Sequence, residues 1–237
     1  MAKVEIKEQV DLDFRSNESY KSLRTNIQFC GSDIKVIGIT SCLPNEGKSS
    51  VCVNLARSFA DSGKKVLLID ADLRKSVLIG GYKIMGPIKG FSHFLSKQAS
   101  FEEVLCETDV KNFHIIFAGQ APPNPAELLG KDQFKKTIAV LRDLYDYIII
   151  DNSPLGSVID AAVVAPECDG MALVVSANRV SYKFAQRVVS QLKKTECPIL
   201  GVILNKVEMG KKGRYGKYYG KYYGKYYGKY YGKYYGE

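Results

Sequence analysis

A glycine, a lysine and a serine stand in a row where their groups could hold the phosphates of a nucleotide. Gly47-Lys48-Ser49 ends a loop that follows a β-branched run and precedes an apolar segment of helix length. Backbone N–H groups of such a loop bind phosphate oxygens, and the helix N-terminus adds a partial positive charge. In this pattern the lysine reaches the β- and γ-phosphates and the serine hydroxyl binds Mg²⁺. The alternative is an ordinary strand-to-helix turn, since Cys42 stands where the first glycine of the pattern is usual.

Two further strand-like runs end in carboxylates. Residues 66–69 are followed by Asp70 and Asp72, and residues 147–150 are followed by Asp151. Ligands of open α/β sheets bind at the carboxyl ends of the strands, and carboxylates suit Mg²⁺ directly or through its waters. The alternative is that each aspartate caps the helix that follows it. That explanation is reasonable for one aspartate and weak for three, so the sequence predicts a magnesium-nucleotide site.

The apolar segments around these residues predict an α/β fold with a doubly wound, mostly parallel sheet. Short β-branched runs without polar alternation are typical of strands covered on both faces. Helix-length segments separate them, and this alternation is typical of doubly wound folds. The strand-like runs are 36–40, 66–69, 114–117, 147–150, 171–175 and 199–204. The helix-like segments are 49–60, 125–144 with an early break at Gly130, 182–193, and a surface helix at 16–29.

The net charge of +9 is concentrated at the C-terminus. Residues 210–237 hold eight Lys or Arg and one acid, a charge of +7, which leaves +2 for the other 209 residues. This nearly neutral body excludes a basic nucleic-acid-binding face. No apolar run approaches the ~20 residues of a membrane-spanning helix. The six cysteines show no CxxC spacing, so we expect a cytoplasmic protein with reduced thiols.

The C-terminal segment has a composition typical of a disordered chain. From Gly216 it repeats Gly-Lys-Tyr-Tyr five times, and residues 210–237 contain 11 of the 16 tyrosines and no aliphatic residue. Such a segment cannot build a packed core. As a flexible coil its 28 residues would span roughly 30 Å on average and about 90 Å at full stretch. We therefore predict a tether that carries hydroxyl groups.

Several motifs together resemble those of the bacterial tyrosine kinases (BY-kinases), in the form that is a separate cytoplasmic protein. Residues 40–50 are similar to the Walker A motif of that family, including its lack of the first glycine. Residues 67–74 resemble its second acidic motif, three apolar residues followed by Asp-x-Asp-x-Arg. Residues 148–154 resemble its Walker B motif, three apolar residues followed by Asp-x-x-Pro, and residues 122–129 its Pro-rich turn into a helix. The family also ends in a tyrosine cluster.

The resemblance implies a P-loop NTPase-like kinase domain over residues 1–209 and an autophosphorylated tail over residues 210–237. The septum-positioning and plasmid-partition ATPases are the nearest competitors, because they share the fold and the Walker B strand. They place a second lysine early in the loop, where Leu43 stands here, and they lack a tyrosine tail. Both differences favour the kinase.

The resemblance also implies contacts between subunits through the helix at residues 16–29. Glu18, Lys21 and Arg24 stand where the family has Glu-x-x-Arg-x-x-Arg. Lys21 replaces the first arginine of that motif and cannot reproduce its bidentate geometry.

The activity implied by the resemblance is an ATP- and Mg²⁺-dependent protein-tyrosine kinase that regulates capsule or exopolysaccharide synthesis and export. Its tail would be phosphorylated in trans within a ring-shaped homo-oligomer. The implied partners are a membrane adaptor of the polysaccharide co-polymerase type, which activates the kinase and recruits it to the inner face of the membrane, and a cognate phosphatase. The predicted phosphorylation sites are Tyr215, Tyr218, Tyr219, Tyr222, Tyr223, Tyr226, Tyr227, Tyr230, Tyr231, Tyr234 and Tyr235.

The resemblance assigns roles to the polar residues at the predicted sheet edge. Asp70 is the candidate acceptor of the tyrosine proton, although Asp72 is not separated from it in this role. The predicted catalytic residues are Lys48, Asp70, Asp72 and Asp151, and the predicted magnesium ligands are Ser49, Asp72 and Asp151. The predicted nucleotide contacts are Cys42, Asn45, Glu46, Gly47, Lys48, Ser49, Ser50 and, at the adenine, Asn205 and Lys206.

The main alternative is a P-loop ATPase or an inactive scaffold. Its basic, tyrosine-rich tail would bind acidic polymers or a membrane surface through charge and stacking. A scaffold needs none of the lysine, serine and aspartate residues at the predicted site, so their presence argues against inactivity.

Overall fold

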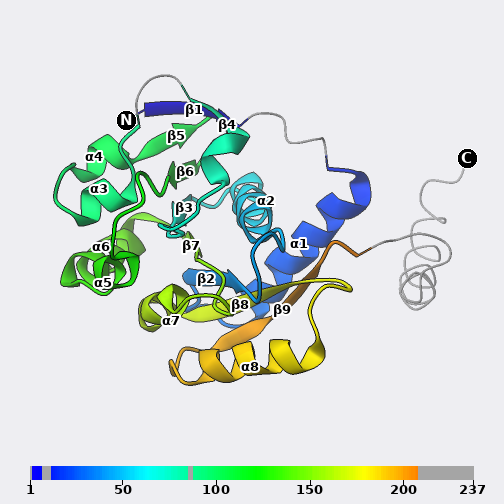
Figure 1. Cartoon of the computed structure of the whole chain (residues 1–237). Coiled ribbons are helices and arrows are strands. Elements are labelled where there is room, and N and C mark those ends of the chain that lie inside the picture. Colours follow the sequence, from blue (N-terminus) through cyan, green and yellow to red (C-terminus); the bar gives the residue numbers. More distant parts are fainter. Residues whose placement is uncertain (1, 7–11, 85–87, 208–237) are drawn as a thin grey trace, which may run out of the picture.

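The computed structural model describes residues 2–6, 12–84 and 88–207. The predicted tether, residues 210–237, and its eleven tyrosines lie outside these described residues. Within them, nine strands form a single sheet in the order β4-β1-β5-β6-β3-β7-β2-β8-β9. Helices cover both faces of this sheet (Figure 1).

Six neighbouring strands are parallel and correspond to the six predicted runs. Each pair in the series β6-β3-β7-β2-β8-β9 is parallel. Their residues are almost entirely apolar because both faces of the sheet are covered. The mostly parallel, doubly wound sheet is thereby confirmed. The bounds are β2 Val36–Ser41, β3 Val66–Asp70, β6 Phe113–Ile116, β7 Tyr147–Asp151, β8 Gly170–Ser176 and β9 Ile199–Asn205.

Three short strands at one side of the sheet were not predicted. They are β1 (Ala2–Ile6), β4 (Tyr82–Ile84) and β5 (Cys106–Thr108). β1 pairs with β4 in antiparallel and with β5 in parallel orientation, and β5 pairs with β6 in antiparallel orientation. Strands of three to five residues carry too little periodicity for sequence analysis, because pairing with neighbours stabilises them more than propensity does.

The helices lie in two layers, one on each face of the sheet. Leu67 and Ile69 of β3 pack into the apolar cluster under α5 to α8, whereas Val66 and Leu68 pack into the cluster under α1 and α2. The predicted break at Gly130 separates α5 from α6. No helix of the described residues is both long and apolar enough to cross a membrane. The main helices are α1 Phe14–Phe29, α2 Lys48–Asp61, α5 Pro125–Leu129, α6 Asp132–Leu144, α7 Asp160–Val164 and α8 Tyr182–Lys193.

Two short helices, α3 (Phe91–Leu95) and α4 (Phe101–Val104), complete the layer under which β3 and β7 are buried. Helix α1 begins after Asp13, whose side chain accepts a hydrogen bond from Ser16 N at 2.8 Å. Its apolar stripe ends at Ile27, which is 4% exposed, while Phe29 is 83% exposed. Two residues correspond to about 200° of helical rotation, so these side chains lie on opposite sides of α1.

The order of the central strands gathers the predicted site. β3, β7 and β2 are direct neighbours and run parallel, so their carboxyl ends meet at one edge. The register pairs Asp70 with Asp151. The loop that follows β2 leads into α2 at the same edge, and Lys48 is the first residue of that helix.

His114 of β6 supplies a test of this packing. Its Nδ1 lies 3.1 Å from the hydroxyl of Tyr145. Burial, with a contribution from Lys65, lowers the pKa of His114 below its ordinary value of 6.5, while Glu107 opposes the shift. The unfolded chain therefore binds more protons just below pH 6.5, and the free energy of unfolding should fall as the pH drops through that value.

We expect His114→Gln to lose less stability than the wild type between pH 7.5 and pH 5.5, measured by urea unfolding at both pH values. An equal loss of stability in both proteins would contradict the conclusion that protonation of His114 causes the loss.

Candidate active site

The loop between β2 and α2 has the backbone of a phosphate-binding loop. Gly47, the N-cap of α2, has φ +85°, a left-handed conformation that favours glycine. A Cβ at this position would lie 2.3 Å from Nδ2 of Asn205, so that side chain would have to move aside. Asn45 is also left-handed, with φ 63°. The N-terminus of α2 points its free N–H groups toward this loop, which favours an anion there.

Lys48 brings a buried positive charge to the carboxyl edge. Its side chain is 7% exposed, its Nζ contacts Oδ1 of Asp151, and it lies 3.9 Å from Oδ2 of Asp72. Burial favours the neutral amine, but the carboxylates, chiefly Asp151, outweigh it and raise the pKa of Lys48 above its ordinary value. The lysine is therefore charged and balances the carboxylate at the end of β7 and the one that follows β3.

Asp70 is buried among charges of its own sign. It is 0% exposed, and burial together with the charge of Asp151 raises its pKa to about 7. The Ser76 hydroxyl donates a hydrogen bond to Oδ2 of Asp70, and the backbone N–H of Asp72 donates to Oδ1 at 3.2 Å. A carboxyl group with a pKa near neutral pH can exchange protons readily.

Asp72 and Asp151 have different surroundings. The Ser153 hydroxyl donates a hydrogen bond of 2.8 Å to Oδ1 of Asp72, and the N–H of Lys75 donates to the same oxygen at 3.2 Å. In contrast, Oδ2 of Asp151 is buried and has no hydrogen-bond partner among the described residues. Such an orphaned carboxylate oxygen is a natural cation ligand.

The oxygen donors at this edge fit Mg²⁺. Ser49 follows Lys48 in the first turn of α2, while Asp72, two residues after β3, and Asp151, the last residue of β7, flank the lysine. Within the described ranges, no group of three His, Cys, Asp or Glu side chains forms a metal site by itself. Mg²⁺ is usually held by one or two carboxylates together with substrate phosphates and water, so a site that is complete only with a nucleotide is consistent with this donor set.

The buried side chain of Glu46 stabilises the loop through hydrogen bonds. The side chain is 1% exposed, and its carboxylate accepts hydrogen bonds from Leu43 N at 2.7 Å and Ser176 N at 2.9 Å. It joins the loop to the end of β8. Among the described residues the backbone N–H of Glu46 has no hydrogen-bond acceptor, whereas its carboxylate is engaged with the protein.

Polar side chains from the last strands contact the outer surface of the loop. Nδ2 of Asn205 donates to the Glu46 carbonyl at 2.9 Å. Lys206 Nζ and Arg179 Nη1 both donate to the Asn45 carbonyl, at 2.8 Å and 3.0 Å. Asn205 and Lys206 therefore contact the loop that precedes α2, and their contact with adenine stays a prediction.

The other predicted nucleotide contacts lie in the same segment. Cys42 is fully buried, and burial together with Glu46 raises the pKa of its thiol to about 11. Ser50 is exposed, and its carbonyl accepts a hydrogen bond from Asn54 at 2.9 Å. Cys42 therefore offers a nucleotide its backbone rather than a reactive thiolate.

The predicted subunit-contact residues lie on α1, which packs along α2. Glu18 and Lys21 pair with each other at 2.7 Å on the exposed face of the helix. Arg24 Nη1 donates to the carbonyl of Ser58 and ties α1 to α2. Arg24 thus makes a contact within the subunit, and the contact between subunits stays a prediction.

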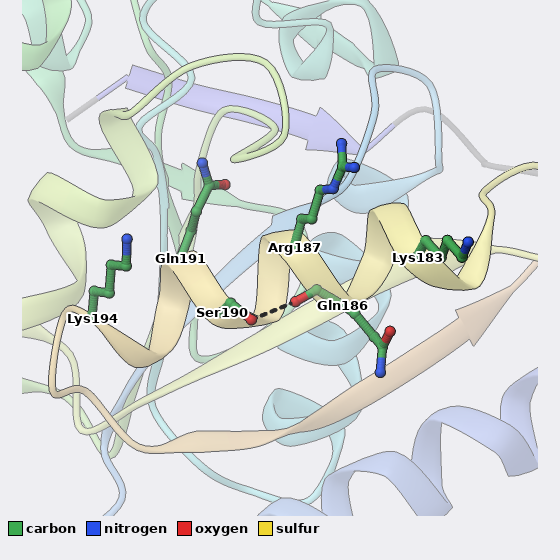
Figure 2. A pocket seen from close by; sticks show the side chains of 6 residues that line it. All are labelled: Lys183, Gln186, Arg187, Ser190, Gln191 and Lys194. Atoms are coloured by element: carbon green, nitrogen blue, oxygen red, sulfur yellow. Dashed lines mark hydrogen bonds between the residues drawn. The ribbon is translucent and has the colours of Figure 1, made fainter.

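A cavity of about 660 Å³ lies outside this site, along the outer face of α8 (Figure 2). Three of its six lining side chains are cationic, and the remainder are polar. It contains none of the predicted site residues. Its lining residues are Lys183, Gln186, Arg187, Ser190, Gln191 and Lys194.

Sequence analysis missed several residues that support the site. Ser76 contacts Asp70, Ser153 contacts Asp72, and the N–H of Ser176 binds Glu46. Ser76 and Ser153 lie in the loops that follow β3 and β7, and Ser176 is the last residue of β8. Single serines at such positions carry no distinctive sequence signal.

Comparisons with known proteins agree with this geometry. The AAA domain family (AAA_31) matches residues 34–197. Tyrosine-protein kinase CpsD of Streptococcus agalactiae is 42% identical over 208 residues, which are 86% of this chain and 91% of that protein. The BceF tyrosine kinase domain has a TM-score of 0.77 and 33% identity, and the match covers 86% of this chain and 83% of that chain.

A more distant structure shares the nucleotide-binding architecture. The septum site-determining protein MinD of Pyrococcus horikoshii, solved with Mg-ADP, has a TM-score of 0.62 and 25% identity, over 75% of this chain and 72% of that chain. The fold is therefore that of the P-loop NTPases. Because the kinase relatives are more similar and cover nearly the whole length, this chain belongs to the bacterial protein-tyrosine kinases.

Proposed function

We propose that this kinase transfers the γ-phosphoryl group of ATP to tyrosine at the edge formed by β2, β3 and β7. The observation that carries the proposal is the contact of Lys48 with Asp151 and its 3.9 Å approach to Asp72, directly after the glycine of the phosphate loop. Phosphoryl transfer requires mainly positioning and neutralisation of charge. A buried lysine between carboxylates at the ends of two neighbouring strand segments is suited to both.

The residues divide into three roles. The loop amides and Lys48 would bind the phosphates, while Ser49, Asp72 and Asp151 would hold Mg²⁺. Bound there, the ion supplies positive charge to the β- and γ-phosphate oxygens. Asp70 would accept the tyrosine proton, because its pKa of about 7 lies closer to the value of about 10 for a phenol than that of an ordinary carboxylate does.

The C-terminal tyrosines are the proposed substrate. β9 runs parallel to β8, so it ends at the same edge as the phosphate loop, and Lys206 next to it contacts that loop. The chain therefore leaves the described residues beside the site. A coil of 28 residues reaches roughly 30 Å on average, which allows its tyrosines to reach this site or that of a neighbouring subunit.

The cellular setting is proposed from the resemblance. It comprises a role in capsule or exopolysaccharide synthesis, activation by a membrane adaptor of the polysaccharide co-polymerase type, a ring-shaped oligomer with transfer in trans, and a cognate phosphatase. A cytoplasmic protein recruited to the inner membrane face through the adaptor is the corresponding location.

The inactive-scaffold alternative is disfavoured by the buried charges. Asp70 and Asp151 are both fully buried and adjacent in register, an arrangement that costs stability. A scaffold would gain by replacing them with apolar residues, whereas a kinase needs them.

The central prediction concerns Lys48→Met. Wild-type protein incubated with ATP, Mg²⁺ and an adaptor peptide should gain multiples of the phosphate mass on its tail, measured by mass spectrometry. Lys48→Met should lower this rate at least ~100-fold, because it removes the charge that stabilises the transferred group. Lys183→Met, the same substitution at an exposed position of α8, is the matched control and should label like the wild type.

Unlabelled wild-type protein under all conditions, or equal labelling of Lys48→Met, would contradict the proposed function. If the protein bound acidic polymers but its tail gained no phosphate, the scaffold alternative would be favoured.

A second prediction separates function from stability at Asp70. Its folded pKa of about 7 lies above its ordinary value of 3.8, so the folded state binds more protons between these values and stability falls as the pH rises through this range. At pH 7.5 without metal, Asp70→Asn should raise Tm by at least about 2 °C, roughly 1 kcal/mol for a domain of this size. Phosphorylation should fall at least ~100-fold.

Asp169→Asn is the control, since Asp169 accepts hydrogen bonds from Arg142 and from two backbone N–H groups and its loss should lower Tm. An unchanged or lower Tm of Asp70→Asn would show that burial of the Asp70 carboxylate does not destabilise the folded protein at this pH.

A third prediction concerns assembly. Each phosphotyrosine adds about −1.5 to −2 charges, so five of them would bring the tail from +7 to about zero or below. We expect phosphorylation to weaken the oligomer. Light scattering of phosphorylated and phosphatase-treated protein should give different masses, and equal masses would refute this electrostatic effect.

A further inference from the structure

Arg74 and Asp160 form a bidentate ion pair beside the active site. Nε and Nη2 of Arg74 lie 2.7 Å and 2.8 Å from Oδ2 and Oδ1 of Asp160. The aspartate side chain is 1% exposed and the arginine side chain is 40% exposed. Two parallel charge-assisted hydrogen bonds fix both distance and orientation, which a single contact does not.

The pair joins the two loops that carry the acids. Arg74 lies two residues after Asp72, in a turn closed by the hydrogen bond from Lys75 N to Asp72 Oδ1. Asp160 is the first residue of α7, at the far end of the loop that begins after Asp151.

Among the described residues, the other hydrogen bonds between these loops lie close to the sheet. They are the hydrogen bonds from Ala71 N to the Asp151 carbonyl, 2.9 Å, and from Ser153 to Asp72, 2.8 Å. The Arg74–Asp160 ion pair therefore connects the two loops farther from the sheet than these hydrogen bonds do.

Because Asp160 is buried, this ion pair is difficult to remove unless Asp160 moves. In the described part of the chain Arg74 is the cation that pairs with this carboxylate. A buried carboxylate without its partner must reach water or take up a proton. If Asp160 moved toward water, the start of α7 and the loop after Asp151 would move with it.

We propose that Arg74 and Asp160 are positioning residues that hold Asp72 and Asp151 at the separation required to bind Mg²⁺ with the nucleotide. Arg74 does not take a catalytic role in this view, because Nε and Nη2 are both engaged with Asp160. The inference rests on the proposed magnesium site and adds to it the residues that maintain its geometry.

The test uses the full chain and a matched ion pair at the opposite edge of the sheet. Arg142 Nη1 lies 2.8 Å from Oδ1 of Asp169, which precedes β8, far along the strands from the site. Both Arg74→Gln and Arg142→Gln remove an arginine from an aspartate, and both should lower Tm. Two readouts then distinguish them: calorimetric binding of ADP with and without Mg²⁺, and the Mg²⁺ concentration for half-maximal tail labelling.

For Arg74→Gln we expect ADP affinity without Mg²⁺ to stay within about twofold of the wild type, while the Mg²⁺ requirement rises at least ~10-fold. Asp160→Asn should behave alike, and the double variant should be no worse than either single variant, since both remove one interaction. Arg74→Lys keeps the positive charge but not the bidentate geometry of the guanidinium. Its Mg²⁺ requirement should therefore lie between those of the wild type and Arg74→Gln. Arg142→Gln should keep the wild-type Mg²⁺ requirement.

A Mg²⁺ requirement of Arg74→Gln and Asp160→Asn within about twofold of the wild type, despite a lowered Tm, would overturn the inference and leave the pair a structural contact. So would an equal rise in Arg142→Gln. Should Arg74→Gln fail to fold, Arg74→Lys and Asp160→Asn decide the question by the same two readouts. Absence of Mg²⁺-dependent ADP binding in the wild type would overturn the proposed magnesium site itself, and with it this inference.

Discussion

A buried lysine set against three carboxylates is the interaction on which the rest of this structure depends. Lys48 contacts Asp151 and approaches Asp72, while Asp70 lies in register beside Asp151. Charges of this kind are costly to bury, and the cost is tolerable only when opposite charges are held close together. Parallel strands covered on both faces provide that constraint, because their backbones cannot shift without disturbing the whole core. The same burial raises the pKa of Asp70 and makes it suitable for proton exchange.

Around this centre, the loop that would hold the phosphates is fixed from several sides. Glu46 ties it to the end of β8, and Asn205 and Lys206 tie it to the end of β9. The last two residues lead directly into the C-terminal segment. The residues that precede the proposed substrate segment, 210–237, are thus hydrogen-bonded to the loop of Gly47. The ion pair of Arg74 with Asp160 extends the same principle to the acidic loops.

The long buried strands and the phosphate loop could be predicted because their signals are local. Runs such as Ile148-Ile149-Ile150 are apolar throughout, since both faces are covered, and Gly47-Lys48-Ser49 follows a strand directly. The short strands β1, β4 and β5 could not be predicted, because three to five residues gain their strand conformation from pairing with distant partners. The exposure of Phe29 is likewise decided by tertiary structure, since only the contact of α1 with α2 decides which side of that helix is covered.

By itself, the sequence determined the class of fold, the strand ends that lead to Lys48, Asp70, Asp72 and Asp151, and the family, because each depends on residue types at short, fixed spacing. Tertiary structure alone decided which of these groups meet and what charge state they prefer. Strand order placed β7 between β3 and β2, so that Asp151 contacts the lysine and raises the pKa of Asp70. It also directed the Glu46 carboxylate into the protein and joined Arg74 to Asp160 across 86 residues. Such contacts arise between segments distant in sequence, and no local pattern specifies them.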